Sequence, residues 1–85
     1  MYKVLISARA QKELSDVPAN DYSKIKDKII SIDQNPRPSG VTKLEGCLHR
    51  VRVGNWRILY DIYDSKKEVL VLRVLRRSER TYKGI

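Results

Sequence analysis

A chain of 85 residues, 41% of them hydrophobic, supports a single domain over residues 1–85 with one thin core. Its apolar runs are too short for a membrane span or a secretory signal, so we expect a cytoplasmic protein with no membrane partner. The formal net charge of +8 points instead to an anionic partner.

The positive charge is concentrated toward the C-terminus. Residues 50–85 carry ten basic and four acidic groups, whereas residues 1–49 carry eight and six. Seven of the nine arginines follow residue 49. A guanidinium binds phosphate through two parallel hydrogen bonds and tolerates desolvation better than an ammonium group. The distribution therefore favours a phosphate-binding surface over a basic face that serves solubility alone.

The N-terminal residues predict a strand followed by a helix. Residues 2–6 form a short apolar β-run. Ser7 is suited to cap a helix that runs to about Val17, and Pro18 is expected to end it. The apolar stripe of this helix comprises Ala10, Leu14 and Val17.

A second helix is expected over residues 22–34, with Asn20 or Asp21 as its cap. Residues 35–40, which include two prolines and a glycine, form a loop long enough to cross an edge of the domain. Cys47, the only cysteine, excludes an internal disulfide and is expected to be buried or half-buried at a strand start. The apolar stripe of the second helix comprises Tyr22, Ile25, Ile29 and Ile32.

Three β-strands are predicted for the remainder, over residues 48–53, 56–63 and 68 to about 76. The Gly-Asn pair between the first two is typical of a tight hairpin turn, which places Arg52 directly opposite Arg57 on one sheet face. Like charges opposite each other destabilise a ladder by about 0.2–1 kcal/mol. Arg50 lies two residues along on the same face, and three guanidinium groups held close together on a rigid element indicate a site for an anion.

Alternation along these strands sets the expected register. Ile58 should lie opposite Val74, and Tyr60 opposite Leu72, because a one-residue slip would put Arg73 into the core. One face is then apolar and comprises Val51, Val53, Trp56, Ile58, Tyr60, Ile62, Leu70, Leu72 and Val74. The other face is an arginine cup formed by Arg50, Arg52, Arg57, Leu59, Asp61, Arg73 and Leu75, with Arg77 just past the strand.

The expected fold class is therefore α+β. An N-terminal strand and a helix hairpin precede a three-stranded antiparallel meander. The strands form one sheet, and both helices cover its apolar face.

Cleavage of RNA that is bound on this arginine-lined sheet face requires three chemical events. The 2′-hydroxyl is deprotonated, the phosphorane charge is stabilised and the 5′-oxygen is protonated. Arginines suit only the second of these events because they stay protonated. Tyr82 is a candidate acid or base-stacking platform. One histidine and scattered carboxylates make no metal-ligand set, and there is no glycine-rich phosphate loop, so we expect no metal and no cofactor.

Residues 43–46, 50–60 and 71–77, together with Tyr82, resemble the RelE/ParE superfamily of bacterial and archaeal toxins. The resemblance spans nearly the whole chain, and the length favours the RelE branch. It implies a fold related to small microbial ribonucleases. It also implies the toxin of a type II toxin–antitoxin pair, a ribosome-dependent and metal-independent mRNA endonuclease that inhibits translation. The implied partners are the ribosome, mRNA and a cognate acidic RelB-like antitoxin that docks a helix in a groove.

The resemblance also assigns roles by position. Arg57 and Arg77 match arginines that stabilise the transition state at phosphate, and Tyr82 matches a tyrosine that stacks on a base or assists proton transfer. Arg50 and Arg52 match catalytic positions that are lysines in the best-known members. A desolvated lysine can lose its proton, whereas an arginine effectively cannot. RNA contacts are expected from Lys43, Arg73, Arg76, Arg80 and Lys83.

The residues leave the general base open among Lys43, His49 and Glu79. They also leave two alternative functions. One is a ParE-like toxin that poisons DNA gyrase. The other is a member of the superfamily that binds RNA or its antitoxin without cutting.

Overall fold

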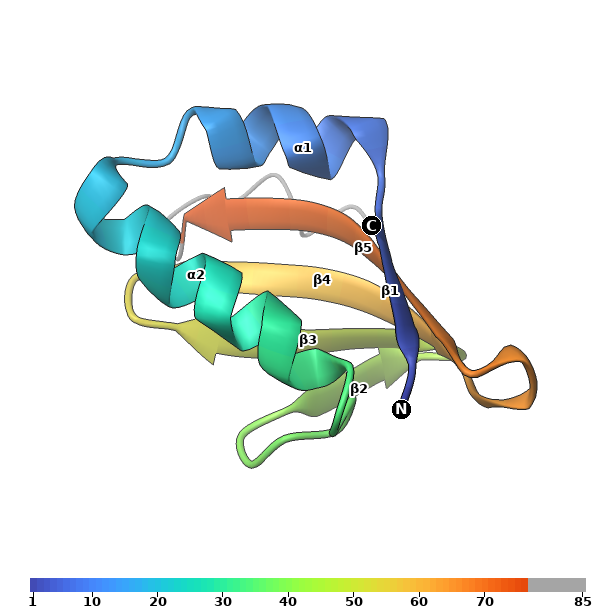
Figure 1. Ribbon diagram of the computed structural model, residues 1–85. Helices are drawn as coiled ribbons and strands as arrows, with labels where there is room; N and C mark the ends of the chain where they lie inside the picture. Colours follow the sequence, from blue (N-terminus) through green and yellow to red (C-terminus); the bar gives the residue numbers. More distant parts are fainter. Residues whose placement is uncertain (77–85) are drawn as a thin grey trace.

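The computed structural model describes residues 1–76, which form one sheet and two helices (Figure 1). The elements are β1 (Lys3–Ile6), α1 (Ala8–Ser15), α2 (Ala19–Ile32), β2 (Thr42–Glu45), β3 (Leu48–Val53), β4 (Trp56–Tyr63), the short 3₁₀ turn η1 (Asp64–Lys66) and β5 (Glu68–Arg76). The five strands lie in the order β1-β5-β4-β3-β2, with β1 parallel to β5 and the other neighbours antiparallel. Figure 1 shows α2 crossing one face of the sheet, and the predicted α+β class is confirmed. Neither helix within residues 1–76 is long and apolar enough to cross a membrane.

Helix α1 begins where the sequence predicts. The Oγ of Ser7 accepts a hydrogen bond from the backbone N–H of Ala10 at 3.1 Å, which is N-cap geometry. The same hydroxyl donates to the carbonyl of Leu72 in β5 at 3.1 Å and so ties the start of the helix to the sheet. The helix ends at Ser15 rather than near Val17, although Val17 still packs in the core.

Helix α2 starts earlier than predicted, and the caps expected at Asn20 and Asp21 are wrong. The helix begins at Ala19, directly after Pro18, whose carbonyl accepts the backbone N–H of Asp21 at 2.9 Å. Pro18 is the N-cap residue, with φ −57° and an extended ψ of 147°, and proline is tolerated there because the N–H that it lacks is not needed at a helix start. Asp21 instead lies inside the first turn, where its carboxylate accepts a hydrogen bond from Trp56 Nε1 at 3.0 Å.

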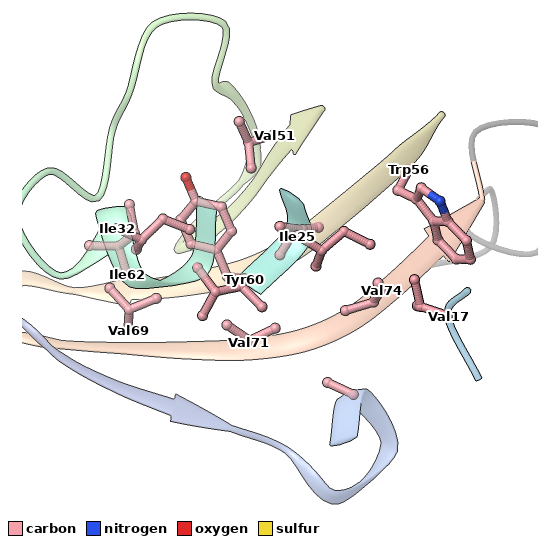
Figure 2. Close-up of a cluster of buried hydrophobic side chains, with 13 residues drawn as sticks. Val17, Ile25, Ile32, Val51, Trp56, Tyr60, Ile62, Val69, Val71 and Val74 are labelled. Atoms are coloured by element: carbon pink, nitrogen blue, oxygen red, sulfur yellow. The ribbon is translucent and has the colours of Figure 1, made fainter. Parts of the chain in front are cut away.

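The hydrophobic core lies between the sheet and the helices. Figure 2 shows Ile25 and Ile32 of α2 near side chains from the strands, with Tyr60 at the centre of the cluster. Tyr22, predicted on the same stripe of α2, is 41% exposed. Val17 and Trp56 belong to the buried cluster, whereas Tyr22 lies outside it.

The register between β4 and β5 is only partly as predicted. Ile58 lies opposite Val74, which confirms one end of the pairing. At the other end Tyr60 lies opposite Val71 instead of Leu72, because a β-bulge leaves Leu72 without a direct partner. A bulge inserts one residue and reverses the face that the residues on one side of it occupy. The core positions of β5 are therefore Val69, Val71 and Val74, and not the predicted Leu70 and Leu72.

A fifth strand, β2, precedes the predicted meander. It pairs with β3, with Thr42 opposite Arg50 and an irregularity between Lys43 and Glu45. All four of its residues are exposed, so no apolar alternation marks it in the sequence. Cys47, predicted to be buried or half-buried, is exposed because it lies in the turn between β2 and β3.

Candidate nucleic-acid interface

The sheet face opposite the core carries the predicted arginines. Arg52 lies directly opposite Arg57, and Arg50 lies opposite Leu59. On the other side of β4, Leu59 also faces Arg73. Directly paired residues of an antiparallel ladder share a face. The predicted grouping is therefore confirmed, and we call it the arginine face; it comprises Arg50, Arg52, Arg57, Leu59, Asp61, Arg73 and Leu75.

The arginine face is exposed at its rim and buried at its centre. Arg52 is exposed, whereas Arg57 is only 9% exposed. Leu59 and Leu75, which neighbour Arg57 on this face, are 1% and 2% exposed. A cation among apolar side chains is less screened by water and attracts an anion more strongly. Arg57 is therefore well placed to stabilise negative charge that develops on a bound phosphate.

A tight hairpin holds Arg52 and Arg57 opposite each other. The turn between β3 and β4 is Gly54-Asn55, and Gly54 has a φ of 59°, a conformation that favours glycine. A left-handed glycine at the first central position is typical of the type II′ hairpin turn. The turn fixes the register, and a slip of β3 by one residue would move Arg52 to the core face, away from Arg57.

Arg73 is held by a carboxylate from α1. Its Nε and Nη2 each lie 2.8 Å from Glu13 Oε2, and Glu13 Oε1 accepts the backbone N–H of Val74 at 2.8 Å. Glu13 thus covers the part of the β5 edge that β1 leaves open, because β1 ends opposite Val71. Arg73 is therefore paired within the chain, and its role in RNA contact stays a prediction.

Glu13 has no role in the sequence-based predictions, although its position carries a signal. It falls at helical spacing among Ala10, Leu14 and Val17, on the apolar stripe of α1. A carboxylate on such a stripe requires a hydrogen-bonding partner when the helix packs. The guanidinium of Arg73 is that partner.

Arg76 ends the arginine-rich strand and contacts the core. Its guanidinium carbon lies 4.8 Å from the centre of the Trp56 ring, directly opposite it in the ladder. Trp56 is 7% exposed and donates to Asp21, so the indole is part of the core, as predicted. Arg76 itself is exposed and keeps its guanidinium at the surface.

Two of the three candidate bases lie on the other face of the sheet. His49 is 4% exposed, its Nδ1 lies 2.7 Å from the carbonyl oxygen of Cys47, and its ring stacks on Tyr60. Lys43 pairs with His49 and so shares its side of the sheet. This placement argues against both as the base for chemistry at Arg57. The remaining predicted residues lie outside the described residues: Arg77, Glu79, Arg80, Tyr82 and Lys83.

The loop between α2 and β2 is fixed by two sets of contacts. Arg37 Nη1 and Nη2 donate to the two carboxylate oxygens of Asp64 at 3.2 and 2.8 Å, and Tyr2 Oη donates to the same carboxylate at 2.7 Å. These hydrogen bonds, that of Arg37 first, lower the pKa of Asp64 to about 2. Tyr60 Oη donates to the carbonyl of Pro36 at 2.7 Å. Burial raises the pKa of Tyr60 to about 12, so this donor is retained at neutral pH.

Solved structures share this fold. A chain of the RelE–RelB complex from Pyrococcus horikoshii superposes with a TM-score of 0.84 at 27% identity, covering 93% of this chain and 98% of that chain. A chain of the intact RelBE toxin–antitoxin complex of E. coli gives a TM-score of 0.77 at 26% identity, covering 94% and 100%. The fold of this chain is therefore one that solved RelE–RelB structures share.

Comparison of sequences identifies the family. The sequence model of one protein family, the ParE toxin of type II toxin–antitoxin systems (parDE), matches residues 4–81. A RelE1 toxin of Methanocaldococcus jannaschii is 31% identical over 89 residues, covering 98% of this chain and 97% of that protein. The chain belongs to the ParE toxin family of type II toxin–antitoxin systems, and the predicted membership of the RelE/ParE superfamily is confirmed.

Proposed function

We propose that this chain is a ribosome-dependent mRNA endonuclease that inhibits translation by metal-independent cleavage. The observation that carries the proposal is the buried guanidinium of Arg57, which lies between Leu59 and Leu75 and directly opposite Arg52. Two guanidinium groups held opposite each other, one of them buried among apolar side chains, attract a phosphate more strongly than a pair fully exposed to water. The resemblance to RelE toxins indicates mRNA as the source of that anion.

The arginine face would stabilise charge in this reaction. A general base takes the proton of the 2′-hydroxyl, and its oxygen then attacks the adjacent phosphorus. Negative charge grows on the non-bridging oxygens until the bond from phosphorus to the 5′-oxygen breaks and the 5′-oxygen takes a proton. The products are a 2′,3′-cyclic phosphate and a free 5′-hydroxyl. Arg57, joined by Arg77, is proposed to stabilise that charge, and Tyr82 to supply the proton or stack on a base. Arg50 and Arg52 are proposed to bind phosphate rather than accept a proton, because arginine stays protonated.

We also propose that an acidic antitoxin silences the chain. The relatives from Pyrococcus horikoshii and E. coli were solved as RelE–RelB complexes. The net charge of +8 favours an acidic partner. An amphipathic acidic helix seated in a groove beside the arginine face would neutralise it. Both partners would act in the cytoplasm, where ribosomes translate.

Primer extension on an mRNA translated by purified ribosomes tests the nuclease. The wild type is expected to cut at discrete codons in the ribosomal A site. Arg57→Ala should lower the cleavage rate by about 10²–10³, as the loss of a preorganised anion donor does. Arg9→Ala is a matched control that should cut normally, because Arg9 lies on α1 with its side chain 68% exposed.

The Arg57→Ala variant must also fold and bind the antitoxin as the wild type does. Loss of either property would count against a catalytic role for Arg57. Intact mRNA in the presence of the wild type would contradict the nuclease itself.

A second candidate function is the poisoning of DNA gyrase, because the matching family model is that of the ParE toxin. A supercoiling assay with purified gyrase distinguishes the two. Inhibited supercoiling with intact mRNA would establish a gyrase poison. No effect in either assay, with RNA binding retained, would establish a member that binds without cutting.

A further inference from the structure

A hollow of about 280 Å³ lies beside the arginine face. One of its walls is formed by the loop before β2, and the proposed chemistry assigns no role to the residues of that wall. The hollow arises because the pairing of β2 with β3 ends at Thr42 opposite Arg50, so that no strand of residues 1–76 pairs with the rest of β3 on that side. The lining residues are Ser39, Gly40, Thr42, Arg50, Val51 and Arg52.

The open edge of β3 directs backbone groups into this hollow. The hairpin closes at Val53 opposite Trp56, and the hydrogen-bonding groups of successive residues alternate between the two sides of a strand. Val53 and Val51 therefore bond toward β4, whereas the N–H and C=O of Arg52 point away from β4, toward the hollow. Ser39 and Thr42 add hydroxyl groups from the facing wall.

The charge of the lining is positive. The part of the lining that residues 1–76 contribute contains two guanidinium groups and no carboxylate. Arg50 and Arg52 form no ion pair within residues 1–76, so no carboxylate of this part of the chain neutralises them. Guanidinium, hydroxyl and backbone N–H groups converging on one small volume match an anion with several acceptor oxygens, as a phosphate has.

The loop wall is held in place by the fold. The ion pair of Arg37 with Asp64 lies two residues before Ser39, and the hydrogen bond from Tyr60 fixes the carbonyl of Pro36. The backbone N–H of Val41 donates to Pro38 at 3.1 Å and closes the turn between them. A wall that is ordered beforehand costs less conformational entropy when a ligand binds.

We propose that this hollow binds the RNA phosphate next to the one at Arg57. Arg52 links the two positions, because it lines the hollow and lies directly opposite Arg57 in the ladder. Arg52 and Arg57 are a pair without hydrogen bonds between them, whose Cα atoms lie about 4.5 Å apart, so one RNA strand can contact both side chains. The inference rests on the proposed RNA-directed function. It assigns Arg50 to this second phosphate and adds binding roles for Ser39 and Thr42.

Binding of short RNA analogues to the wild type tests the subsite. The ligands are trinucleotides with 2′-O-methyl groups, which cannot be cut, carrying either two phosphates or one phosphate and one neutral methylphosphonate at either linkage. The wild type should bind the ligand with two phosphates about tenfold more tightly than the analogue whose methylphosphonate lies in the hollow. A difference of about tenfold is the expected effect of losing one charge-assisted contact. The slope of log affinity against log salt concentration should be steeper by about 0.7 for the ligand with two phosphates than for that analogue.

The double variant Arg50→Gln/Thr42→Val should reduce this preference to less than about twofold and remove the difference in salt slope. Lys26→Gln, which removes one exposed charge from α2, should keep both. A preference retained in the double variant, or equal binding of all ligands by the wild type, would overturn the subsite. Because none of these ligands is cleaved, the binding result does not depend on nuclease activity. If mRNA on ribosomes stays intact while the tenfold binding preference is observed, the proposed cleavage is refuted and the proposed subsite is supported.

Discussion

Asp64 is the residue whose charge should govern the stability of the loop contacts at acid pH. Hydrogen bonds from Arg37 and then Tyr2 lower its pKa from 3.8 to about 2. A carboxyl whose pKa is lowered by folding contributes stability above its unfolded pKa and loses it as the pH falls through the folded value. The free energy of unfolding should therefore drop more steeply between about pH 4 and pH 2 in the wild type than in Asp64→Asn. Urea unfolding at a series of pH values measures this.

Tyr2→Phe provides the graded control for that experiment. It removes one hydrogen bond to Asp64 and leaves the ion pair with Arg37 in place. Its pH profile should lie between those of the wild type and Asp64→Asn. Parallel profiles for all three proteins would show that the contact contributes nothing to stability.

Individual side-chain partners are the part of the site that periodicity predicts least. The position of Arg52 opposite Arg57 follows from the two-residue turn and is found in the structure. Arg73 has the parity of the same face, yet its guanidinium is paired with Glu13. Strand alternation assigns a face but holds no information on which helix side chain reaches the edge of the sheet.

Among the elements, α1 and β5 are joined by Glu13. Its side chain and that of Arg73 are 20% and 15% exposed, and the carboxylate also accepts the backbone N–H of Val74. Glu13→Gln keeps the shape and removes the charge. It should lower the free energy of unfolding by about 1.5–3 kcal/mol, the worth of hydrogen bonds to a charged group. Urea unfolding should show a lower midpoint with an unchanged slope.

A double-mutant cycle attributes this loss to the pair. Arg73→Gln and the double variant Glu13→Gln/Arg73→Gln complete it, and a coupling of about 0.5–3 kcal/mol is expected for residues in contact. Effects that simply add would mean that the carboxylate acts through Val74 alone.

The pairing of β5 shows where element-level prediction stops. Residues 69–72 read Val-Leu-Val-Leu, so both parities are apolar and alternation cannot select a face. Arg73 breaks the ambiguity only for the end of the strand, where the pairing of Ile58 with Val74 is correctly predicted. The earlier part is set by β1, whose Val4 and Ile6 pair with Val69 and Val71. Such a parallel contact between distant segments leaves no mark in local sequence.

On the scale of the whole molecule, charge should control how fast the proposed antitoxin binds. The net charge is +8, and ten of the eighteen basic residues lie in residues 50–85. Opposite charges steer two proteins together, and salt screens the attraction beyond about 10 Å at 0.1 M. The association rate constant with an acidic antitoxin segment should fall at least about tenfold between about 50 mM and about 500 mM salt, while the dissociation rate constant changes less.

Two variants of equal charge locate the steering surface. Arg50→Gln/Arg52→Gln removes two charges from the arginine face, and Lys24→Gln/Lys26→Gln removes two from the exposed side of α2. If the antitoxin meets the arginine face, the first variant should slow association several-fold more than the second, because the field of a charge weakens with distance and screening. Stopped-flow mixing measures both. Equal slowing would assign the steering to net charge alone, and association that does not depend on salt would contradict an acidic partner for this face.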